Sequence, residues 1–408
     1  MAEDFPIGLS LHEACARMVA LGAARRLGPE SVPLASALGR VLAQDVHAPI
    51  DLPPFANSAM DGFAVRAADV SASAEVSLRI VGTRLAGDGR TAAIGPGECL
   101  RITTGAPLPQ GADAIAIKEN VRVAGDTARL CGPLAPGTHV RAAGEDLARG
   151  ALALAGGTAL DAGALSLLAA CGFPHAPVVR APTAVLLTTG DELVEPGGAL
   201  GAGQIYDSNR SGLAALLGQS GARVLRHERV RDDPAALRAA LLAACDGDLV
   251  LTSGGVSAGE ADFLPRLLQE IGRVHLWKVR MKPGMPLLVG EVGGSLLCCL
   301  PGNPVSGMAT FLALVRPAID AMLGRAARQL RRARLAIPVH KRHARAEYLR
   351  AQSRWDADGT LWVTPLRGQG SGMLHALAQA DCLALIPEDV SGLDRGAVVE
   401  VLPLPGRD

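Results

Sequence analysis

The stretch AVLLTTGDEL at residues 184–193 decides how the centre of this chain is expected to fold. Its apolar half, from Val185 to Thr188, has the length and composition of a strand that is buried on both faces. The run then ends in a glycine and two carboxylates, and a helical stretch follows at 211–219. The segment therefore predicts a strand, a polar loop and a helix in that order.

The same alternation continues from Pro182 to Gly324. A helix start is expected at Asp232-Asp233-Pro234, because Asp caps free amides and Pro suits the first turn. Strand–helix alternation predicts a mostly parallel sheet that is covered on both faces, and such sheets bind ligands outside the carboxyl ends of their strands. The remaining expected strands cover 224–230, 248–253, 274–279, 286–289 and 296–300, and the remaining helices cover 262–271 and begin near 303.

The segments before residue 182 and after residue 324 have different patterns of apolar and turn-forming residues. Helical spacing of apolar residues predicts an amphipathic helix over 8–26, which could pair with a second helix at 162–171. Between them, short apolar stretches separated by Gly, Pro and Asp predict an inserted β-rich domain. After residue 330, strand-like runs and the turn Asp358-Gly359 predict a small β-barrel or sandwich. The predicted domains are 1–50 with 142–180, then 51–141, 181–328 and 329–408.

Composition narrows the class of protein. The 408 residues carry 40 basic and 40 acidic side chains, and zero net charge gives no bulk attraction to nucleic acid or an anionic membrane. The N-terminus lacks a signal-peptide pattern, and no apolar run approaches the ~20 residues of a spanning helix. Eight scattered cysteines form no C-x-x-C pair. We therefore expect a cytoplasmic protein with reduced thiols that binds neither nucleic acid nor membrane.

Polar, glycine-rich loops follow four of the predicted strands, beginning at Thr188, Arg231, Thr252 and Leu300. Small residues after a strand leave backbone amides free to bind an anion, and the next helix N-terminus adds positive potential. Tight turns would explain one such loop, whereas four at one sheet edge favour an anion site. The dinucleotide fingerprint and the Walker loop are both missing from the sequence, so neither a standard NAD fold nor a Walker ATPase is expected.

Three cations alternate in the segment WKVRMKPG at 277–284: Lys278, Arg280 and Lys282. Alternate residues of a strand share a face, so the spacing predicts that the three side chains point the same way. A solvated edge strand would have the same pattern. The turn Lys282-Pro-Gly-Met-Pro286 beside the glycine loops favours phosphate binding instead.

Carboxylates gather at the same predicted edge. Carboxylates beside an anion site indicate a bridging hard cation, most simply Mg²⁺, because bare carboxylates would repel phosphate. Two structural alternatives stay open: Asp232 could cap its helix, and Asp262 could be an N-terminal helix charge. The acidic residues are Asp191, Glu192, Asp207, Asp232, Asp233, Glu260 and Asp262.

Seven short motifs occur in one order between Pro53 and Ser306: NSAMDG, TGAP, GED, TGDEL, SGGVSxGExD, KPGxP and LPGNPVS. The first two lie in the predicted β-rich domain, and GED follows it directly. In this order they resemble the MoeA/gephyrin family of molybdopterin molybdenumtransferases. The resemblance implies a multidomain α/β plus β fold: a MogA-like doubly wound α/β domain, a discontinuous helical domain with an inserted β-rich domain, and a small C-terminal β-barrel. Ala56, where an acidic residue is common, and Gly307, where Ala is common, are mild departures.

The resemblance also implies an activity. It points to an elongated homodimer that, with Mg²⁺, cleaves adenylylated molybdopterin, inserts molybdate and releases AMP. Its expected partners are a pterin adenylyltransferase and other proteins of cofactor biosynthesis or molybdoenzyme maturation. Two other activities stay open: pterin adenylyltransfer, as in MogA, and a non-catalytic cofactor-binding scaffold.

Site roles follow from the resemblance residue by residue. Glu192, Asp232 and Asp262 are the expected metal ligands. Together with Asp61, Thr104 and Asp146 they are also the expected catalytic residues. Substrate binding is expected at Thr189, Gly190, Asp191, Ser253, Gly254, Gly255, Ser257, Lys278, Lys282, Pro301, Gly302, Asn303 and Pro304.

Overall fold

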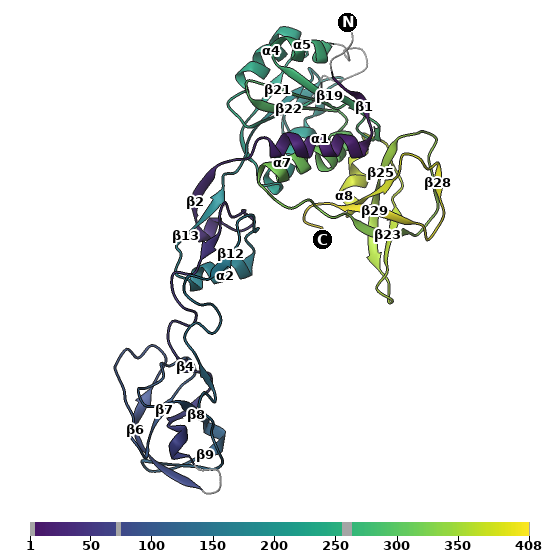
Figure 1. Cartoon of the computed structure of the whole chain (residues 1–408). Coiled ribbons are helices and arrows are strands. Elements are labelled where there is room, and N and C mark those ends of the chain that lie inside the picture. The colour runs from purple at the N-terminus through teal and green to yellow at the C-terminus, as the bar shows by residue number, and fades with distance from the viewer. Residues whose placement is uncertain (1–4, 71–74, 255–262, 408) are drawn as a thin grey trace. The chain divides into compact units, whose positions relative to one another are not determined.

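The computed structural model describes residues 5–70, 75–254 and 263–407. The described chain forms two compact units, whose elements are labelled in Figure 1. Unit 1 contains the N-terminal residues up to Glu30, residues 39–41 and everything from Val178 onward. Unit 2 contains Ser31–Leu38 and Leu42–Pro177.

Unit 1 is built on a seven-stranded sheet. Its strands are, in spatial order, β1 (Ile7–Leu9), β19 (Arg273–Val279), β21 (Leu288–Val292), β22 (Ser295–Leu300), β18 (Leu249–Ser253), β14 (Thr183–Thr189) and β17 (Arg223–Val230). Of these seven, only β21 runs antiparallel to its neighbours. The prediction of a mostly parallel sheet is confirmed, and the reversal at β21 is a feature that the apolar pattern did not reveal.

Helices cover both faces of this sheet. One face packs on α1 (Leu11–Ala23), α3 (Ser208–Gln219), α6 (Pro304–Thr310) and α7 (Arg316–Met322), and the other packs on α4 (Pro234–Ala243) and α5 (Phe263–Ile271). Figure 1 shows α4 and α5 above the strands and α1 and α7 below them. Within β14, Leu186 belongs to the first cluster and Leu187 to the second, because successive strand residues face opposite sides.

The N-terminal segment begins with a strand rather than a helix. β1 pairs with β19, and α1 begins only after Ser10. Ser10 and Glu13 form a capping box, in which the Ser10 hydroxyl accepts from the Glu13 amide and the Glu13 carboxylate accepts from the Ser10 amide. The predicted helix start at residue 8 is therefore wrong. The partner of α1 is α7, not the predicted second helix, which is α2 (Ala162–Ala170) and belongs to unit 2.

Helices α6 and α7 are joined by a π-helical turn, η4 (Phe311–Val315), so residues 304–322 form one helical stretch. Among the described helices it is the one that is long and apolar enough to cross a membrane. The expectation that no apolar run approaches that length is wrong here. The stretch is 83% buried within the fold, and Phe311, Leu314 and Ile319 belong to the core of unit 1. Packing inside the protein accounts for its composition.

The C-terminal part of unit 1 is a closed barrel of five strands: β25 (Ala346–Trp355), β26 (Leu361–Pro365), β23 (Arg331–Leu335), β29 (Val398–Pro403) and β27 (Cys382–Ile386). Pairing between β25 and β27 closes it, which decides between the predicted barrel and sandwich. The short strand β20 (Met281–Lys282) adds to β25 in parallel, and this ties the barrel to the α/β part of unit 1. The barrel also carries β24 (Val339–His340), β28 (Gly392–Leu393) and α8 (Leu374–Gln379).

Unit 2 holds the predicted β-rich insertion. Its six-stranded sheet has the order β8 (Ala114–Ile117), β5 (Gly62–Val65), β7 (Glu98–Ile102), β6 (Val76–Arg84), β10 (Thr127–Leu130) and β9 (Val121–Ala124). Two short pairs accompany it, β4 (Asn57–Ser58) with β11 (Val140–Arg141) and β3 (Val46–His47) with β12 (Leu152–Leu154). The fold class predicted from the resemblance is confirmed, while the domain boundaries stay a prediction.

Candidate active site

Parallel pairing brings the predicted strand-end loops of unit 1 to one edge of the sheet. The register sets Thr189 of β14 beside Val230 of β17, and Thr188 beside Ser253 of β18. Ser253 in turn lies beside Leu300 of β22. The four loops that follow these strands therefore leave the sheet together, as the sequence predicted.

The two central loops approach each other closely. Gly254 has φ +97°, and a Cβ at this position would lie 2.5 Å from the Thr189 carbonyl oxygen. Gly302 lies against Gly254 from the other side, with 3.4 Å between an added Cβ and the Gly254 Cα. Only glycine fits at position 254, because any side chain would collide with β14. The loops are therefore in direct backbone contact, and the Gly254 amide donates to the Leu300 carbonyl at 3.3 Å. The Thr189 hydroxyl is buried there with no partner among the described residues.

Asn209, in the first turn of α3, ties these loops together. Its side-chain amide donates to the Ser253 hydroxyl at 2.7 Å and to the Gly302 carbonyl at 2.7 Å. A single side chain thus fixes the loops after β18 and β22 relative to the start of α3. Sequence reasoning placed Asn209 in a polar loop without a role, because the contact depends on which strands are neighbours.

Thr188, Asp207 and His227 form a buried polar cluster next to this edge. The Thr188 hydroxyl donates to the Asp207 carboxylate at 2.7 Å and lies 3.0 Å from His227 Nε2. Asp207 also caps α3 by accepting from the Arg210 amide at 3.0 Å. Burial lowers the pKa of His227, with a smaller contribution from Arg210, so this imidazole is neutral near pH 7. The cluster holds the β14 loop in place, and Asp207 is structural.

Three carboxylates gather where β14 and β17 end. Loss of solvent, then the charges of Glu192 and Asp191, raise the pKa of Asp232, and a hydrogen bond with the Asp191 backbone partly offsets them. Asp233, not Asp232, caps α4, because its Oδ1 accepts from the Ala236 amide at 2.8 Å. The alternative that Asp232 is only a helix cap is thereby removed. Exposed carboxylates that repel one another are a suitable place for a cation.

The remaining predicted residues of this edge divide into two groups. Gly255, Ser257 and Asp262 lie outside the described residues. Gly190 is buried, Asp191 and Glu192 are exposed, and Pro301 to Pro304 form the turn into α6, whose N-cap is Asn303. Among the residues described, no group of three or more His, Cys, Asp or Glu is arranged to hold a metal. Glu192 and Asp232 still fit Mg²⁺, which usually takes one or two carboxylates together with water and substrate phosphate.

The three predicted cations do not share one face. β19 ends at Val279, Lys278 adopts a left-handed backbone with φ +59°, and Lys282 lies in β20 of the barrel sheet. The alternation prediction is therefore wrong, because one strand was assumed where the chain changes sheet. The Lys278 ammonium lies 3.9 Å from the Trp277 ring centroid. Arg280 pairs with Glu388, and the Lys282 ammonium lies 2.8 Å from Glu347 Oε1.

One cation of the barrel was missed by the sequence reasoning. Arg350 of β25 is fully buried, and its Nε and Nη1 have no hydrogen-bond partner among the described residues. Its Nη2 donates to the Gly368 carbonyl at 2.8 Å. The loop that follows is joined to α6, since the Val305 amide donates to the Ser371 carbonyl at 3.1 Å. No motif marked this arginine, because its burial depends on the barrel's docking.

A second set of predicted residues lies in unit 2. Asp61 Oδ1 accepts from both the amide and the hydroxyl of Thr104, each at 2.9 Å, and Oδ2 lies 3.4 Å from the Lys118 ammonium. The Thr104 amide, then its hydroxyl, and then Lys118 lower the pKa of Asp61. Gly62 of β5 allows the backbone of β8 to approach closely here, because a Cβ would lie 2.0 Å from the Ala116 carbonyl oxygen. Lys118 carried no sequence signal, since β5 and β8 must pair before it reaches Asp61.

Asp146 lies in an exposed turn of the same unit. Its amide donates to the Leu52 carbonyl at 2.9 Å, and the neighbouring Gly144 amide donates to the Pro53 carbonyl at 2.9 Å. The Asp146 carboxylate has no hydrogen-bond partner within the described ranges. The structure therefore joins the GED and NSAMDG segments through the backbone and leaves this carboxylate open to solvent.

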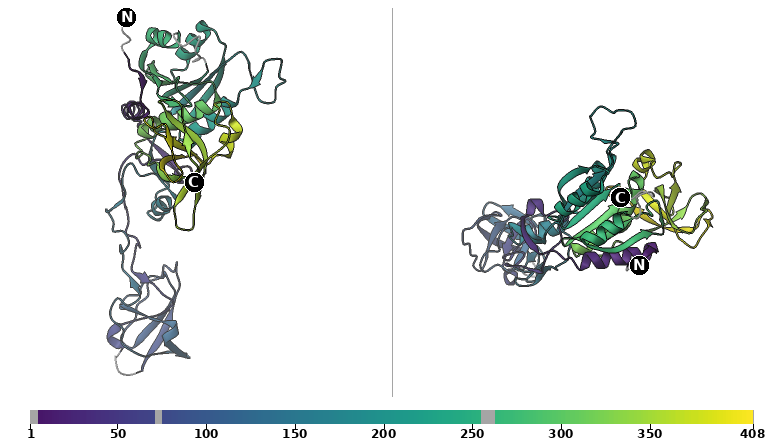
Figure 2. Two further views of the ribbon diagram at one scale, coloured as in Figure 1. Left: turned by 90° about the vertical axis from the view of Figure 1, so that its right-hand side faces the viewer. Right: turned by 90° about the horizontal axis from the view of Figure 1, so that it is seen from above.

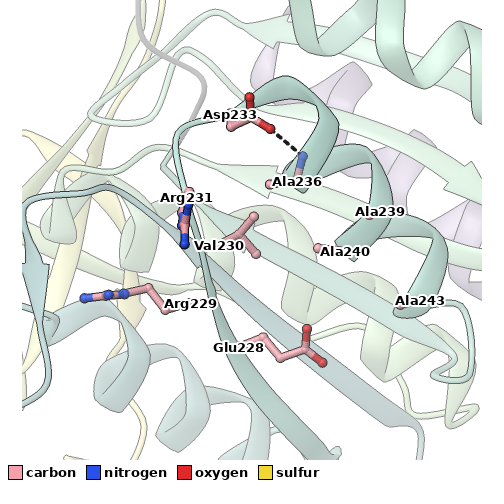
Figure 3. A pocket seen from close by; sticks show the side chains of 9 residues that line it. All are labelled: Glu228, Arg229, Val230, Arg231, Asp233, Ala236, Ala239, Ala240 and Ala243. Carbon is pink, nitrogen blue, oxygen red and sulfur yellow. Dashed lines mark hydrogen bonds between the residues drawn. The ribbon is translucent and has the colours of Figure 1, made fainter.

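Two surface features flank the edge of unit 1. The β15 (Leu193–Val194) and β16 (Ile205–Tyr206) pair carries a loop that projects from the unit in both views of Figure 2. An open depression of about 500 Å³ lies along β17 and α4. Figure 3 shows that Arg229 and Arg231 extend away from the alanines of α4. This depression includes Arg231 and Asp233 of the loop after β17, and none of the residues predicted to be catalytic, substrate-binding or metal-binding lines it.

Comparison with known proteins shows the family to which the chain belongs. The MoeA N-terminal region (domain I and II) matches residues 9–172, a probable molybdopterin binding domain matches 185–321, and the MoeA C-terminal region (domain IV) matches 332–404. A Haemophilus influenzae protein named molybdopterin molybdenumtransferase is 35% identical over 92% of this chain and 93% of its own length. The chain belongs to the MoeA family.

Other members are similar over comparable lengths. Molybdopterin molybdenumtransferase 2 of Mycobacterium tuberculosis is 37% identical over 93% of this chain and 96% of its own length. The crystal structure of a MoeA protein from Pyrococcus horikoshii superposes with a TM-score of 0.82 at 32% identity, covering 97% of this chain and 99% of that one. The family predicted from seven motifs is confirmed, and the predicted enzyme class agrees with the names of these relatives.

Proposed function

We propose that this protein is a molybdopterin molybdenumtransferase of molybdenum cofactor biosynthesis, which inserts molybdate into adenylylated molybdopterin and releases AMP. The observation that carries the proposal is the meeting of four polar loops at one sheet edge in a chain of the MoeA family. Such an edge is where open α/β sheets bind ligands. Its glycine-rich loops, together with Lys278 and Lys282, suit an anionic substrate.

The edge would bind the phosphates of the substrate. Gly254 and Gly302 have no side chains that would obstruct a ligand between the loops, and Asn209 keeps these loops in register. Lys278 and Lys282 supply positive charge nearby, and charge-assisted hydrogen bonds are about twice as strong as neutral ones. Molybdate is a dianion, so cations and hydroxyl groups at the site would also lower its repulsion from the bound phosphates.

Mg²⁺ would be held by Glu192 and Asp232, with Asp262 as a further ligand outside the described residues. Such an ion offsets charge on the leaving phosphate. Loss of solvent, then the charges of Glu192 and Asp191, raise the pKa of Asp232, and a bound cation would favour its ionised form. Mg²⁺-dependent turnover that falls in Glu192→Gln and Asp232→Asn at unchanged folding would support this assignment.

Asp61 and Thr104 would act in turnover from unit 2. Because Thr104 and Lys118 lower the pKa of Asp61, this carboxylate is ionised at neutral pH and serves as a hydrogen-bond acceptor or base rather than an acid. The exposed carboxylate of Asp146 is assigned to the same reaction by the family motif. The protein is further proposed to be a cytoplasmic homodimer that receives its substrate from a pterin adenylyltransferase.

An AMP-release assay tests the proposed function. The purified chain is incubated with adenylylated molybdopterin, molybdate and Mg²⁺, and AMP is quantified with each component omitted in turn. The proposal expects AMP only when all are present. ATP consumption with unmodified molybdopterin would identify an adenylyltransferase instead, and tight pterin binding without AMP under any condition would identify a scaffold.

A further inference from the structure

A carboxylate of the C-terminal barrel faces a lysine of the candidate phosphate site. Glu347, on β25, is only 7% exposed, and its Oε1 lies 2.8 Å from the Lys282 ammonium. The two residues are register partners in the parallel pairing of β20 with β25. We infer that Glu347 is a positioning residue, which holds the Lys282 ammonium where it meets the anionic substrate; this inference rests on the function proposed above.

The exposure of the two side chains indicates that Glu347 positions Lys282, and that Lys282 is the residue that meets the substrate. Lys282 is 43% exposed, whereas Glu347 is 9% exposed by its side chain. A lysine ammonium has three N–H donors, and Glu347 Oε1 occupies one of them. The other donors remain on the solvent side and can reach a phosphate. Because lysine has a flexible four-carbon stem, a fixed acceptor at one N–H limits the positions that the ammonium takes.

The second carboxylate oxygen of Glu347 faces a histidine that does not compete with Lys282 for the negative charge. Glu347 Oε2 lies 3.4 Å from His343 Nε2, and His343 Nδ1 is buried with no hydrogen-bond partner among the described residues. Burial lowers the pKa of His343, and although Glu347 opposes this, the charges of Lys282, Arg345 and Lys341 lower the pKa further. The imidazole is therefore neutral near pH 7, and the negative charge of Glu347 is balanced by Lys282. A buried carboxylate with one cationic partner keeps that partner in place.

A second ion pair also joins the α/β part of unit 1 to the barrel, and it provides a matched control for the Lys282–Glu347 pair. Arg280, two residues before Lys282, pairs with Glu388 of the barrel. Arg280 Nη1 also donates to the Gly8 carbonyl at 2.6 Å, so this cation is committed to the fold. If the Lys282–Glu347 pair only fastened the barrel to the α/β part, both pairs would behave alike. The inference expects them to differ in substrate binding.

The test measures KM for adenylylated molybdopterin and kcat in Glu347→Ala, Glu347→Gln and Glu388→Ala. Glu347→Ala should raise KM about five- to tenfold with kcat within about twofold, as expected for lost substrate positioning. Glu347→Gln, which keeps an acceptor, should stay within about twofold of wild type. Glu388→Ala should leave KM unchanged. Thermal unfolding of all three variants reports on the fold separately.

A double-mutant cycle gives the decisive comparison. Lys282→Ala alone should raise KM about tenfold or more, and adding Glu347→Ala should raise it no further, because Glu347 acts through Lys282. A further increase in the Lys282→Ala background, or equal KM values for Glu347→Ala and wild type, would overturn the inference while leaving the proposed function standing. A normal KM in Lys282→Ala would overturn both the inference and the placement of the phosphate site.

Discussion

The sheet edge of unit 1 and the Asp61 turn of unit 2 are assembled in different ways. At the edge, Thr188, Ser253 and Leu300 come from three strands that lie far apart in sequence, and their meeting depends on the parallel register. In unit 2, Asp61 and Thr104 adjoin β5 and β7, and direct hydrogen bonds of 2.9 Å join them. The edge is made by the register of parallel strands, whereas the Asp61 site is made by the antiparallel pairing of β5 with β7, which brings together residues 43 positions apart in sequence.

The difference has consequences for what mutations should do. The edge contains buried groups and a glycine that cannot be replaced, so changes there should affect folding and binding together. The Asp61 side chain is 46% exposed, so its replacement should affect function with little loss of stability. Variants whose stability, binding and turnover are measured separately therefore test whether the two sites differ in this way.

The largest combined effect is expected for Gly254→Ala. Its φ of +97° and the 2.5 Å approach to the Thr189 carbonyl predict a loss of roughly 2–3 kcal/mol in the free energy of unfolding, with turnover abolished. Urea unfolding and the AMP assay measure both quantities. Gly218→Ala is the control, because the added Cβ meets no atom within 4 Å in α3. Normal stability of Gly254→Ala would show that the edge is less tightly assembled than described.

Asp61→Asn should lose nearly all turnover while the free energy of unfolding stays within about 1 kcal/mol of wild type. The reason is that Asn keeps the size of the side chain and removes the charge that Thr104 and Lys118 stabilise. Steady-state AMP release and thermal unfolding measure the two effects, with Glu119→Gln as an exposed control from the same segment. Near-normal AMP release would make Asp61 a turn residue only.

A smaller effect is expected for Asn209→Ala. Removing its amide leaves the Ser253 hydroxyl and the Gly302 carbonyl without this donor, which costs roughly 1–3 kcal/mol. KM for the pterin substrate should rise more than kcat falls, because the loops that bind phosphate lose their register. The neighbouring exposed residue gives a control variant, Ser208→Ala. Equal KM values for the two variants would mean that Asn209 does not organise the edge.

The smallest effect on turnover is expected at the opposite end of the sheet. Asp248 accepts from Arg180 Nη2 at 2.8 Å and from the Thr183 amide at 2.7 Å. Burial raises its pKa, but these bonds prevail and lower the pKa from 3.8 to about 2. A depressed carboxyl pKa stabilises the fold above the unfolded value and loses that contribution as pH falls.

Wild-type stability should therefore decrease between about pH 4 and pH 2. Asp248→Asn should be less stable at pH 7 and show a flatter profile over that range, while kcat for the folded variant stays normal. Urea unfolding at several pH values measures this. An unchanged profile in Asp248→Asn would assign the acid sensitivity to other groups.

Sequence patterns predicted what local chemistry determines. The buried run at 185–188, the Asp-Pro start of α4 and the Asp358-Gly359 turn each carry their signal within a few residues. The seven motifs then identified the family. The start of α1 is also marked locally, since Ser10 and Glu13 form a Ser-x-x-Glu capping box, whereas the spacing of apolar residues alone extends the helix too far toward the N-terminus.

Contacts between distant segments could not be predicted. Lys278 and Lys282 look like one strand face until the chain changes from β19 to β20. Asn209 and Glu347 carry no motif, and their roles depend on strand order and barrel docking. Periodicity describes one element at a time, so it does not show which elements become neighbours.

The most direct test of the comparison is a binding titration. Adenylylated molybdopterin is titrated by calorimetry into wild type, Asp61→Asn and Lys282→Ala under conditions without turnover. If the edge of unit 1 binds the substrate and Asp61 acts in turnover, Asp61→Asn should bind within about twofold of wild type, and Lys282→Ala should bind about tenfold or more weakly. Wild-type affinity in Lys282→Ala, or an equal loss in both variants, would contradict this division of roles.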